Sequence, residues 1–310
     1  MQLFFGVNQF SGAGGAVVTL GNFDGFHLGH NQIIAQTVGA AGEKGLQAVA
    51  MTFHPHPRQL FSGDLSVLTP LENKVALLGQ SGLDVLVIQP FTREFASLEP
   101  QAFVQEILLQ GLGTRHLVVG YDYTFGRGAG GTTQALQHWG QELGFTCNVV
   151  EAVRDGGEIV SSTAIRRYLT RGDVLTAARF LGRPYFIDGK VEHGAGRGSK
   201  LGFPTANVYP KKFMTLPAYG VYLVEVLVNG SGYYGVANIG YNPTFASLDI
   251  ALEVNIFNFS SDLYGKKIKV GFLRHIRNEI YFSNPADLIK QIKEDILVAR
   301  ALLDKHYVLN

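Results

Sequence analysis

The chain has 310 residues, which fits two domains better than one, and 46% of them are hydrophobic, enough for substantial cores. Its 26 lysines and arginines nearly balance its 25 aspartates and glutamates, which argues against a broad electrostatic grip on nucleic acid or an anionic membrane. A single cysteine excludes an intrachain disulfide, and neither a signal-like start nor an apolar run of about 18 residues is present, so we expect a cytoplasmic protein.

The first half of the chain alternates between apolar runs and helical patterns. Buried strands are expected at residues 16–20, 46–53, 84–88, 116–119 and 145–150. Helices are expected between them, at residues 28–41, 71–80, 100–109 and 132–143. Continuous apolar strands separated by helices predict a Rossmann-like α/β domain, a parallel sheet covered on both faces that binds ligands at the C-terminal ends of its strands.

A glycine-rich turn, GNFDGFHLGH, follows the first of these strands at residues 21–30. Glycines let a ligand approach the backbone closely, and the amides that open the next helix favour a phosphate. His27 and His30 can face one phosphoryl group and donate to it as charge grows in the transition state. A zinc site built from Asp24, His27 and His30 is the less favoured alternative, because no cysteine lies near. The candidate nucleotide-binding residues of the turn are Gly21, Asn22, Phe23, Asp24, Gly25 and Gly29.

A second candidate phosphate-binding segment, SSTAIR, opens a helix at residues 161–166. Its hydroxyls can cap the helix and contact phosphate, and Arg166 can bind a phosphate through two hydrogen bonds. Alone, the pattern is as typical of an ordinary N-cap. The candidates are Ser161, Ser162, Thr163 and Arg166. Together with H-x-G-H after a strand, the segment resembles the nucleotidyltransferase superfamily, which transfers AMP or CMP from a triphosphate to a phosphate acceptor.

Two aromatic loops follow the second and fourth expected strands. They are TFHPHP at residues 52–57 and VGYDYTFG at residues 119–126. Each is also compatible with an ordinary proline- or glycine-rich loop, but aromatic faces beside a nucleotide site suit a flat ring system. The candidate flavin-binding residues are Phe53, His56, Asp122 and Phe125.

The second half changes to short alternating strands. They are expected at residues 186–192, 220–227, 233–238, 251–257 and 267–272, separated by tight turns, and they predict an all-β antiparallel barrel. A C-terminal amphipathic helix should follow, capped by Asn284, with Pro285 in its first position. Its apolar stripe is Leu288, Ile292, Ile296, Ala299 and Leu303. The change in pattern predicts domains of residues 1–182 and 183–310.

Residues 194–207, GAGRGSKLGFPTAN, form a glycine-rich loop of another kind. Pro204 stands where a dinucleotide-binding loop would need a helix, and the spacing does not fit a Walker A loop. The backbone amides of such a loop can still cradle phosphates. The candidate phosphate-binding residues are Gly194, Gly196, Gly198 and Gly202. Thr205 and Asn207 offer oxygen ligands of the kind that Mg²⁺ accepts.

Glu253 is the one carboxylate in an apolar strand pattern at residues 250–257, where a charge needs a reason. A surface ion pair on the outer face of the barrel is the alternative. The glycine loop and its closing PTAN resemble riboflavin kinase, and the likeness continues through GVY at 220–222, NIGYNPTF at 238–245, LEVNIF at 252–257 and LYGK at 263–266.

With both sets of motifs, nearly the whole chain resembles the bacterial bifunctional riboflavin kinase/FMN adenylyltransferase family. The resemblance implies that the barrel phosphorylates riboflavin to FMN with Glu253 as catalytic base, and that the α/β domain uses His27 and His30 to adenylylate FMN to FAD. Mg²⁺ is the implied cofactor and ATP the co-substrate. Asn255 stands where the family commonly has histidine, Tyr241 and Asn242 where an arginine often precedes Pro-Thr, and Tyr123 and Thr124 where it has Phe-Arg.

Two other functions stay open at this point. The chain could be a paralogue that retains one activity and acts as a flavin- or nucleotide-binding protein, or a nucleotidyltransferase for another acceptor such as pantetheine phosphate. The expected partners are small-molecule substrates, namely riboflavin, FMN and ATP, with neither nucleic acid nor membrane. Self-association stays open.

Overall fold

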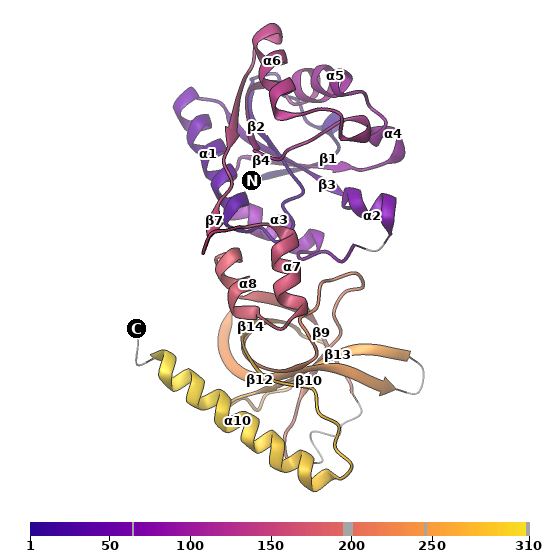
Figure 1. The fold of residues 1–310 in the computed structure, drawn as a ribbon, viewed down its shortest axis with the longest axis vertical. Helices are drawn as coiled ribbons and strands as arrows, with labels where there is room; N and C mark the ends of the chain where they lie inside the picture. The colour runs from indigo at the N-terminus through magenta and orange to yellow at the C-terminus, as the bar shows by residue number, and fades with distance from the viewer. Residues whose placement is uncertain (64, 195–200, 245–246, 308–310) are drawn as a thin grey trace. The chain divides into compact units, whose positions relative to one another are not determined.

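The computed structural model describes residues 1–63, 65–194, 201–244 and 247–307. The chain divides into two compact units, Met1–Ser162 and Thr163–Asn310 (Figure 1). The division groups most of α7 (Ser162–Thr170) and all of α8 (Val174–Leu181) with the second unit. The boundary between the two activities, expected after Gly182, stays a prediction.

The first unit is built on a six-stranded parallel sheet with the order β1-β4-β3-β2-β5-β6, which confirms the expected class. Its strands are β1 (Gln2–Phe5), β2 (Ala16–Leu20), β3 (Gln47–His54), β4 (Val85–Pro90), β5 (Thr114–Gly120) and β6 (Thr146–Val150). The main helices are α1 (Leu28–Lys44), α3 (Leu71–Gly79), α6 (Thr133–Leu143), and α5 (Pro100–Ala102) continued by the π-helix η2 (Phe103–Gly111).

Helices cover both faces of this sheet. Val17 and Val118 belong to one core cluster with α1 and α3, whereas the neighbouring Val18 and Leu117 belong to another with η2 and α6. Successive strand residues thus pack in opposite directions, and both directions are buried. The shorter elements of the unit are η1 (Val7–Gln9), α2 (Pro57–Ser62), α4 (Arg93–Ala96), η3 (Arg127–Ala129), β7 (Arg154–Asp155) and β8 (Glu158–Ile159).

The second unit contains a closed antiparallel barrel with the order β10-β13-β12-β11-β14-β9. Its strands are β9 (Tyr185–Glu192), β10 (Ala206–Val208), β11 (Gly220–Val228), β12 (Ser231–Thr244), β13 (Ser247–Ile256) and β14 (Lys267–Asn278). Asn229 and Gly230 join β11 to β12 with positive φ angles of 50° and 84°, the conformation of a tight hairpin turn. The short strand β10 closes the barrel by pairing with both β9 and β13.

Helix α10 (Pro285–Tyr307) lies along the outside of the barrel, against β11, β12 and β14 (Figure 1). The Asn284 Oδ1 accepts a hydrogen bond from the backbone N–H of Asp287 at 2.9 Å, which confirms the expected cap. Ile296, Ala299 and Leu303 pack in a cluster with Leu223 and other barrel residues, which confirms the inward face of the later part of the helix.

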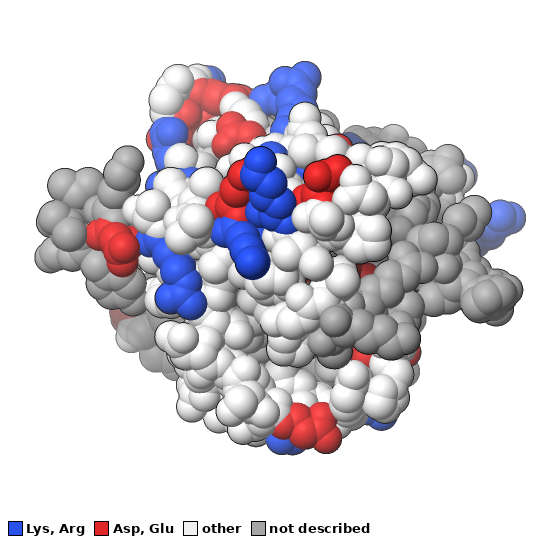
Figure 2. All heavy atoms as spheres, turned by 90° about the horizontal axis from the view of Figure 1, so that it is seen from below, with Lys and Arg blue, Asp and Glu red and all other residues white. Residues whose placement is uncertain are grey.

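Helix α8 packs on the outside of β9 and β14. None of the described helices is both long and apolar enough to cross a membrane. On the face shown in Figure 2, blue and red side chains of the described residues are interspersed and do not gather by sign. This mixture agrees with the near balance of acidic and basic residues in the sequence.

Candidate active sites

The glycine-rich turn joins β2 to α1 at the C-terminal edge of the sheet. Phe23 and Phe26 have positive φ angles of 46° and 44°, a conformation that is uncommon for bulky residues. Phe23 is 1% exposed, so packing holds the turn in this shape. Backbone strain of this kind is typical of ligand-binding segments, where the surrounding structure fixes it.

The Asp24 side chain ties the turn to the segment before α3. Its carboxylate accepts hydrogen bonds from the backbone N–H groups of Leu68 and Thr69, at 3.0 and 2.9 Å. The Thr69 hydroxyl in turn accepts from the N–H of Gly25 at 3.1 Å. These contacts direct the buried Asp24 carboxylate toward the backbone of the protein itself. Direct contact between Asp24 and a nucleotide stays a prediction.

His27 and His30 are brought together at the start of α1. Their rings stack with centroids 3.6 Å apart, and the Nδ1 of His27 accepts from the N–H of His30 at 3.4 Å, so His27 caps the helix. A Cβ at Gly29 would lie 3.2 Å from the His27 ring, which explains the glycine between them. Among the described residues, no group of three or more His, Cys, Asp or Glu side chains is arranged to hold a metal.

Ser162 contacts this turn from outside, and Asn22 lies within it. The Ser162 hydroxyl donates to the backbone carbonyl of Asp24 at 2.8 Å, so the serine motif is joined to the turn through its backbone. The Oδ1 of Asn22 is buried and has no hydrogen-bond partner among the described residues. A buried acceptor of this kind is satisfied when a ligand donates to it. Thr163 and Arg166 fall in the second unit, and their part in a phosphate site stays a prediction.

The candidate flavin residues lie within or beside the aromatic core of the first unit. Phe53 contacts Phe91, and Phe125 contacts Phe103, with ring centroids 5.5 and 5.3 Å apart. Both candidates are less than one tenth exposed. The Nδ1 of His56 caps α2 by accepting from a backbone N–H at 3.2 Å. These contacts give Phe53, His56 and Phe125 structural roles, whereas Asp122 is exposed. Flavin binding by all four residues stays a prediction.

Lys74 was not foreseen from the sequence. It lies three residues after Leu71 and four before Leu78, on the buried face of α3, and it is 5% exposed. Its Nζ donates to the Thr52 hydroxyl at 3.4 Å. Burial lowers the pKa of Lys74 to about 8, against the opposing attraction of Asp24. A lysine within an apolar helical stripe is the signal that could have identified this buried cation.

A cavity of about 250 Å³ lies in the second unit, between the barrel and α10. Its polar lining includes Thr205, Asn207, Asn238, Glu253 and Asn255, and its charged lining also includes Arg277, Glu279 and Asp295; its apolar lining includes Val221, Val236, Phe282, Leu288 and Ile292. The cavity therefore combines polar groups that suit phosphates and hydroxyls with apolar side chains that suit a flat ring.

Glu253 faces outward from the barrel into this cavity. Its neighbours on β13, Leu252 and Val254, are fully buried, so Glu253 points to the opposite side of the strand. Asn238 and Asn207 stand directly opposite Glu253 on the two adjoining strands, and paired residues of a sheet share a face. Because α10 covers part of this face, the outward-pointing carboxylate of Glu253 lines a cavity and is not on an open surface.

Asn207 has the properties expected of a metal ligand. It is 6% exposed, lines the cavity, and carries a buried Oδ1 without a hydrogen-bond partner among the described residues. A Cβ at Gly194 would lie 2.6 Å from that oxygen, so the first glycine of the loop allows close approach. Thr205 lines the same cavity. Two oxygen donors that line one cavity beside a glycine-rich loop fit Mg²⁺, and its binding here stays a prediction.

The remaining loop residues are placed less completely. Gly202 has a φ of 86°. Gly196 and Gly198 lie outside the described residues. Asn255, which departs from the family pattern, donates from its Nδ2 to the backbone carbonyl of Pro204 at 2.8 Å. Asn255 thus tethers the segment that leads into Thr205.

Comparison with known proteins gives the same picture of both halves. The family model for FAD synthetase matches residues 10–164, and the model for riboflavin kinase matches residues 181–303. A bifunctional riboflavin kinase/FMN adenylyltransferase of Bacillus subtilis is 41% identical over 287 residues, 90% of each chain. Its Escherichia coli K12 counterpart is 39% identical over 305 residues, 97% of each chain. A Streptococcus pneumoniae crystal structure, described as a macrolide-efflux protein, has a TM-score of 0.88 at 32% identity, covering 97% of this chain and 99% of that one.

Proposed function

We propose a division of roles within this chain, which belongs to the family of bifunctional riboflavin kinase/FMN adenylyltransferases. The chain phosphorylates riboflavin to FMN with ATP and transfers an adenylyl group from ATP to FMN, forming FAD. We assign phosphorylation to the barrel and adenylyl transfer to the α/β unit. We also place the protein in the cytoplasm, with riboflavin, FMN and ATP as its small-molecule partners.

In the kinase reaction, Glu253 takes the proton of the ribityl 5′-hydroxyl as that oxygen attacks the γ-phosphoryl group of ATP. Asn207 and Thr205 would hold Mg²⁺, which would neutralise charge on the phosphates. The amides of the glycine loop would receive the phosphates, and the apolar side chains of the cavity would receive the ring of riboflavin. Catalysis then rests on positioning and on charge neutralisation.

In the adenylyl transfer, His27 and His30 donate to the triphosphate at the start of α1. The phosphate of FMN attacks the α-phosphorus and pyrophosphate leaves. This phosphate is largely ionised near neutral pH, with a second pKa of about 6, so no protein base is required. The stacked rings of His27 and His30 support this assignment, because they present two imidazoles at one helix start.

The observation that carries the kinase assignment is the row formed by Asn238, Glu253 and Asn207 across three adjoining strands, beneath the cover of α10. A general base contributes about 10²–10⁴-fold to a rate. Glu253→Gln preserves size and hydrogen bonding but cannot accept the proton. Riboflavin phosphorylation should fall at least about 100-fold, while FAD formation from supplied FMN is retained and the cooperative unfolding transition of the barrel unit serves as the control for folding. Kinase activity near that of the wild type would return Glu253 to a surface role.

A further inference from the structure

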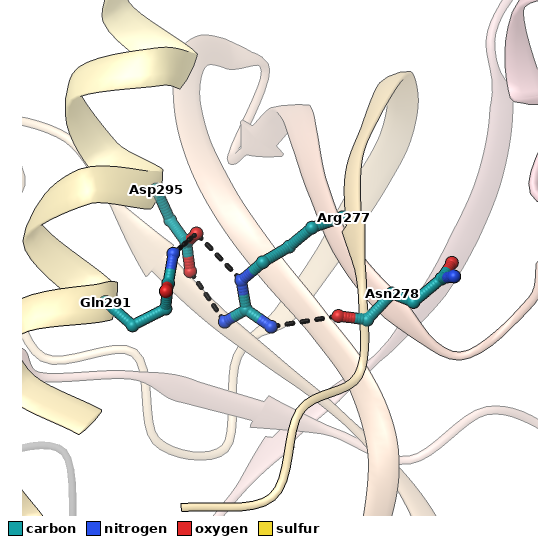
Figure 3. Close-up of polar contacts among 4 residues, drawn as sticks. All are labelled: Arg277, Asn278, Gln291 and Asp295. Carbon is teal, nitrogen blue, oxygen red and sulfur yellow. Dashed lines mark hydrogen bonds and ion pairs between the residues drawn. The ribbon is translucent and has the colours of Figure 1, made fainter. Parts of the chain in front are cut away.

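A buried ion pair joins the barrel to α10 at the wall of the kinase cavity (Figure 3). Arg277 of β14 donates from Nε and Nη2 to the two carboxylate oxygens of Asp295, both at 2.8 Å. Gln291, one turn earlier on α10, donates to the same carboxylate at 3.1 Å. The side chain of Asp295 is 5% exposed and that of Arg277 is 19% exposed.

The third arm of the guanidinium bonds to the neighbouring residue of its own strand. The Nη1 of Arg277 donates to the backbone carbonyl of Asn278 at 2.9 Å, where β14 ends (Figure 3). The segment that follows carries Glu279, Ile280 and Phe282, and all three line the cavity. One guanidinium therefore joins the last residues of the strand to the helix, directly before the segment that lines the cavity.

The pair lies between two parts of α10 that have different tasks. From Ile296 to Leu303 the helix packs on the barrel in an apolar cluster. Before Asp295, Leu288 and Ile292 line the cavity. Apolar packing thus holds the later part of the helix, and the ion pair holds the helix at the point where it begins to form the cavity wall.

Such a pair is a weak source of stability, because burying both charges costs about as much as their attraction returns. Its two parallel hydrogen bonds do fix direction and distance, which apolar side chains do not. We propose that Arg277 and Asp295 are positioning residues of the kinase: they hold the part of α10 that carries Leu288 and Ile292 at a fixed distance from the barrel, so that a flat fused-ring substrate fits and its hydroxyl chain is placed at Glu253. This inference rests on the proposed binding of riboflavin in this cavity.

The test uses the full chain with Asp295→Asn, and with Arg277→Lys, which keeps the charge but loses the two-pronged geometry. The matched control is Asp188→Asn. Asp188 is 4% exposed, as is Asp295, and it forms an ion pair with Lys267 at 2.6 Å. Among the described residues, Asp188 is not one of those that line the cavity. Four quantities are measured: kcat, KM for riboflavin, KM for MgATP, and the inhibition constant of lumiflavin, which has the flavin ring without the hydroxyl chain.

In both pair variants, kcat/KM for riboflavin should fall about 10- to 100-fold through a higher KM, because misplacement of a substrate is costly. The inhibition constant of lumiflavin should rise in parallel, with KM for MgATP changed less than about twofold. The control should match the wild type. If Asp295→Asn does not fold, as shown by loss of the cooperative unfolding transition of its second unit, Arg277→Lys decides.

Three results would overturn the inference. A fall in kcat with unchanged riboflavin KM and lumiflavin inhibition would show that the pair does not shape the ring site. An equal effect in Asp188→Asn would show a general loss of barrel stability. Failure of lumiflavin to inhibit the wild-type kinase would instead overturn the binding of riboflavin in this cavity, and the inference with it.

Discussion

At the scale of single residues, Lys74 has a consequence for stability. The folded protein holds its proton less tightly than the unfolded chain, because burial lowers the pKa from 10.5 to about 8. Between these two values the unfolded chain binds more protons, so this group makes the free energy of unfolding rise with pH. The full rise from this group is about 3 kcal/mol at 1.36 kcal/mol per pKa unit.

Replacing Lys74 with Met should remove this rise. The wild type should gain stability, relative to Lys74→Met, as the pH increases from about 7.5 to 10, by roughly 2–3 kcal/mol. Urea unfolding of both proteins at several pH values in this window measures the difference. The comparison cancels other groups that titrate there, and parallel pH profiles would contradict a buried, weakly protonated Lys74.

His30 provides the residue-scale test of adenylyl transfer. Removing one donor that stabilises developing charge costs about 10²–10³ in rate. His30→Ala should therefore accumulate FMN from riboflavin and form little FAD, while the kinase rate stays unchanged. The two products are separated by chromatography. FAD formation from added FMN at about the wild-type rate would remove His30 from the phosphate site.

At the scale of elements, the cap of α10 lies on the same helix as a cavity wall. Asn284→Ala should lower the free energy of unfolding by about 1 kcal/mol, the usual cost of a lost N-cap. Asn284→Ser keeps an acceptor for the N–H of Asp287 and a donor for its carboxylate, and should stay near the wild type. Chemical denaturation of the three proteins measures the order. Equal losses in both variants would mean that the capping bond contributes nothing.

Some helices and strands could be predicted from sequence patterns alone, and others could not. Residues 16–20 form β2 with the expected bounds, and α10 begins at Pro285, because the signals for both are local. Strand β10 has only three residues and begins within the PTAN motif, so it is too short for an alternating pattern to be visible in the sequence. Pairing with two other strands of the closed barrel defines it. The sequence neighbours of Glu253 indicate on which side of β13 its side chain lies. That this side forms a cavity depends on α10, a helix more than 30 residues later in the chain, and could not be predicted from the strand alone.

The candidate site shows the same limit. His27 and His30 stack because they are close in sequence at one helix start, so their proximity was predictable. Arg277 and Asp295 are 18 residues apart on different elements, and nothing local in the sequence joins them. Asp24 could be assigned to the turn but not to the backbone of residues 68 and 69, which the fold brings to it.

At the scale of the whole molecule, α7 and α8 bear on where the chain can be cut. Ala177, Phe180 and Leu181 of α8 are buried, and the backbone of Ala218 donates to the carbonyl of Leu169 at 2.9 Å. A fragment of residues 183–310 lacks these contacts, and burying one large apolar side chain contributes about 1.5–3 kcal/mol.

Residues 163–310 expressed alone should therefore convert riboflavin to FMN, form no FAD and unfold cooperatively. Residues 183–310 should carry out the same reaction with a free energy of unfolding lower by at least about 2 kcal/mol. Thermal or urea unfolding of the two fragments measures this difference. Equal stability would show that α7 and α8 add nothing to the barrel, and a folded longer fragment without kinase activity would contradict the separation of the two sites.

The outward position of Glu253 also bears on the order in which a ribosome completes the protein. The barrel strands, with Glu253 and Asn207, all precede α10 in the chain, whereas the cavity needs α10 as its wall. A chain released early, before residue 285, would have every barrel strand but would lack α10, which packs on Leu223 and Phe257 and lines the cavity. With the division of roles proposed above, we expect such a chain to consume FMN without being able to make it.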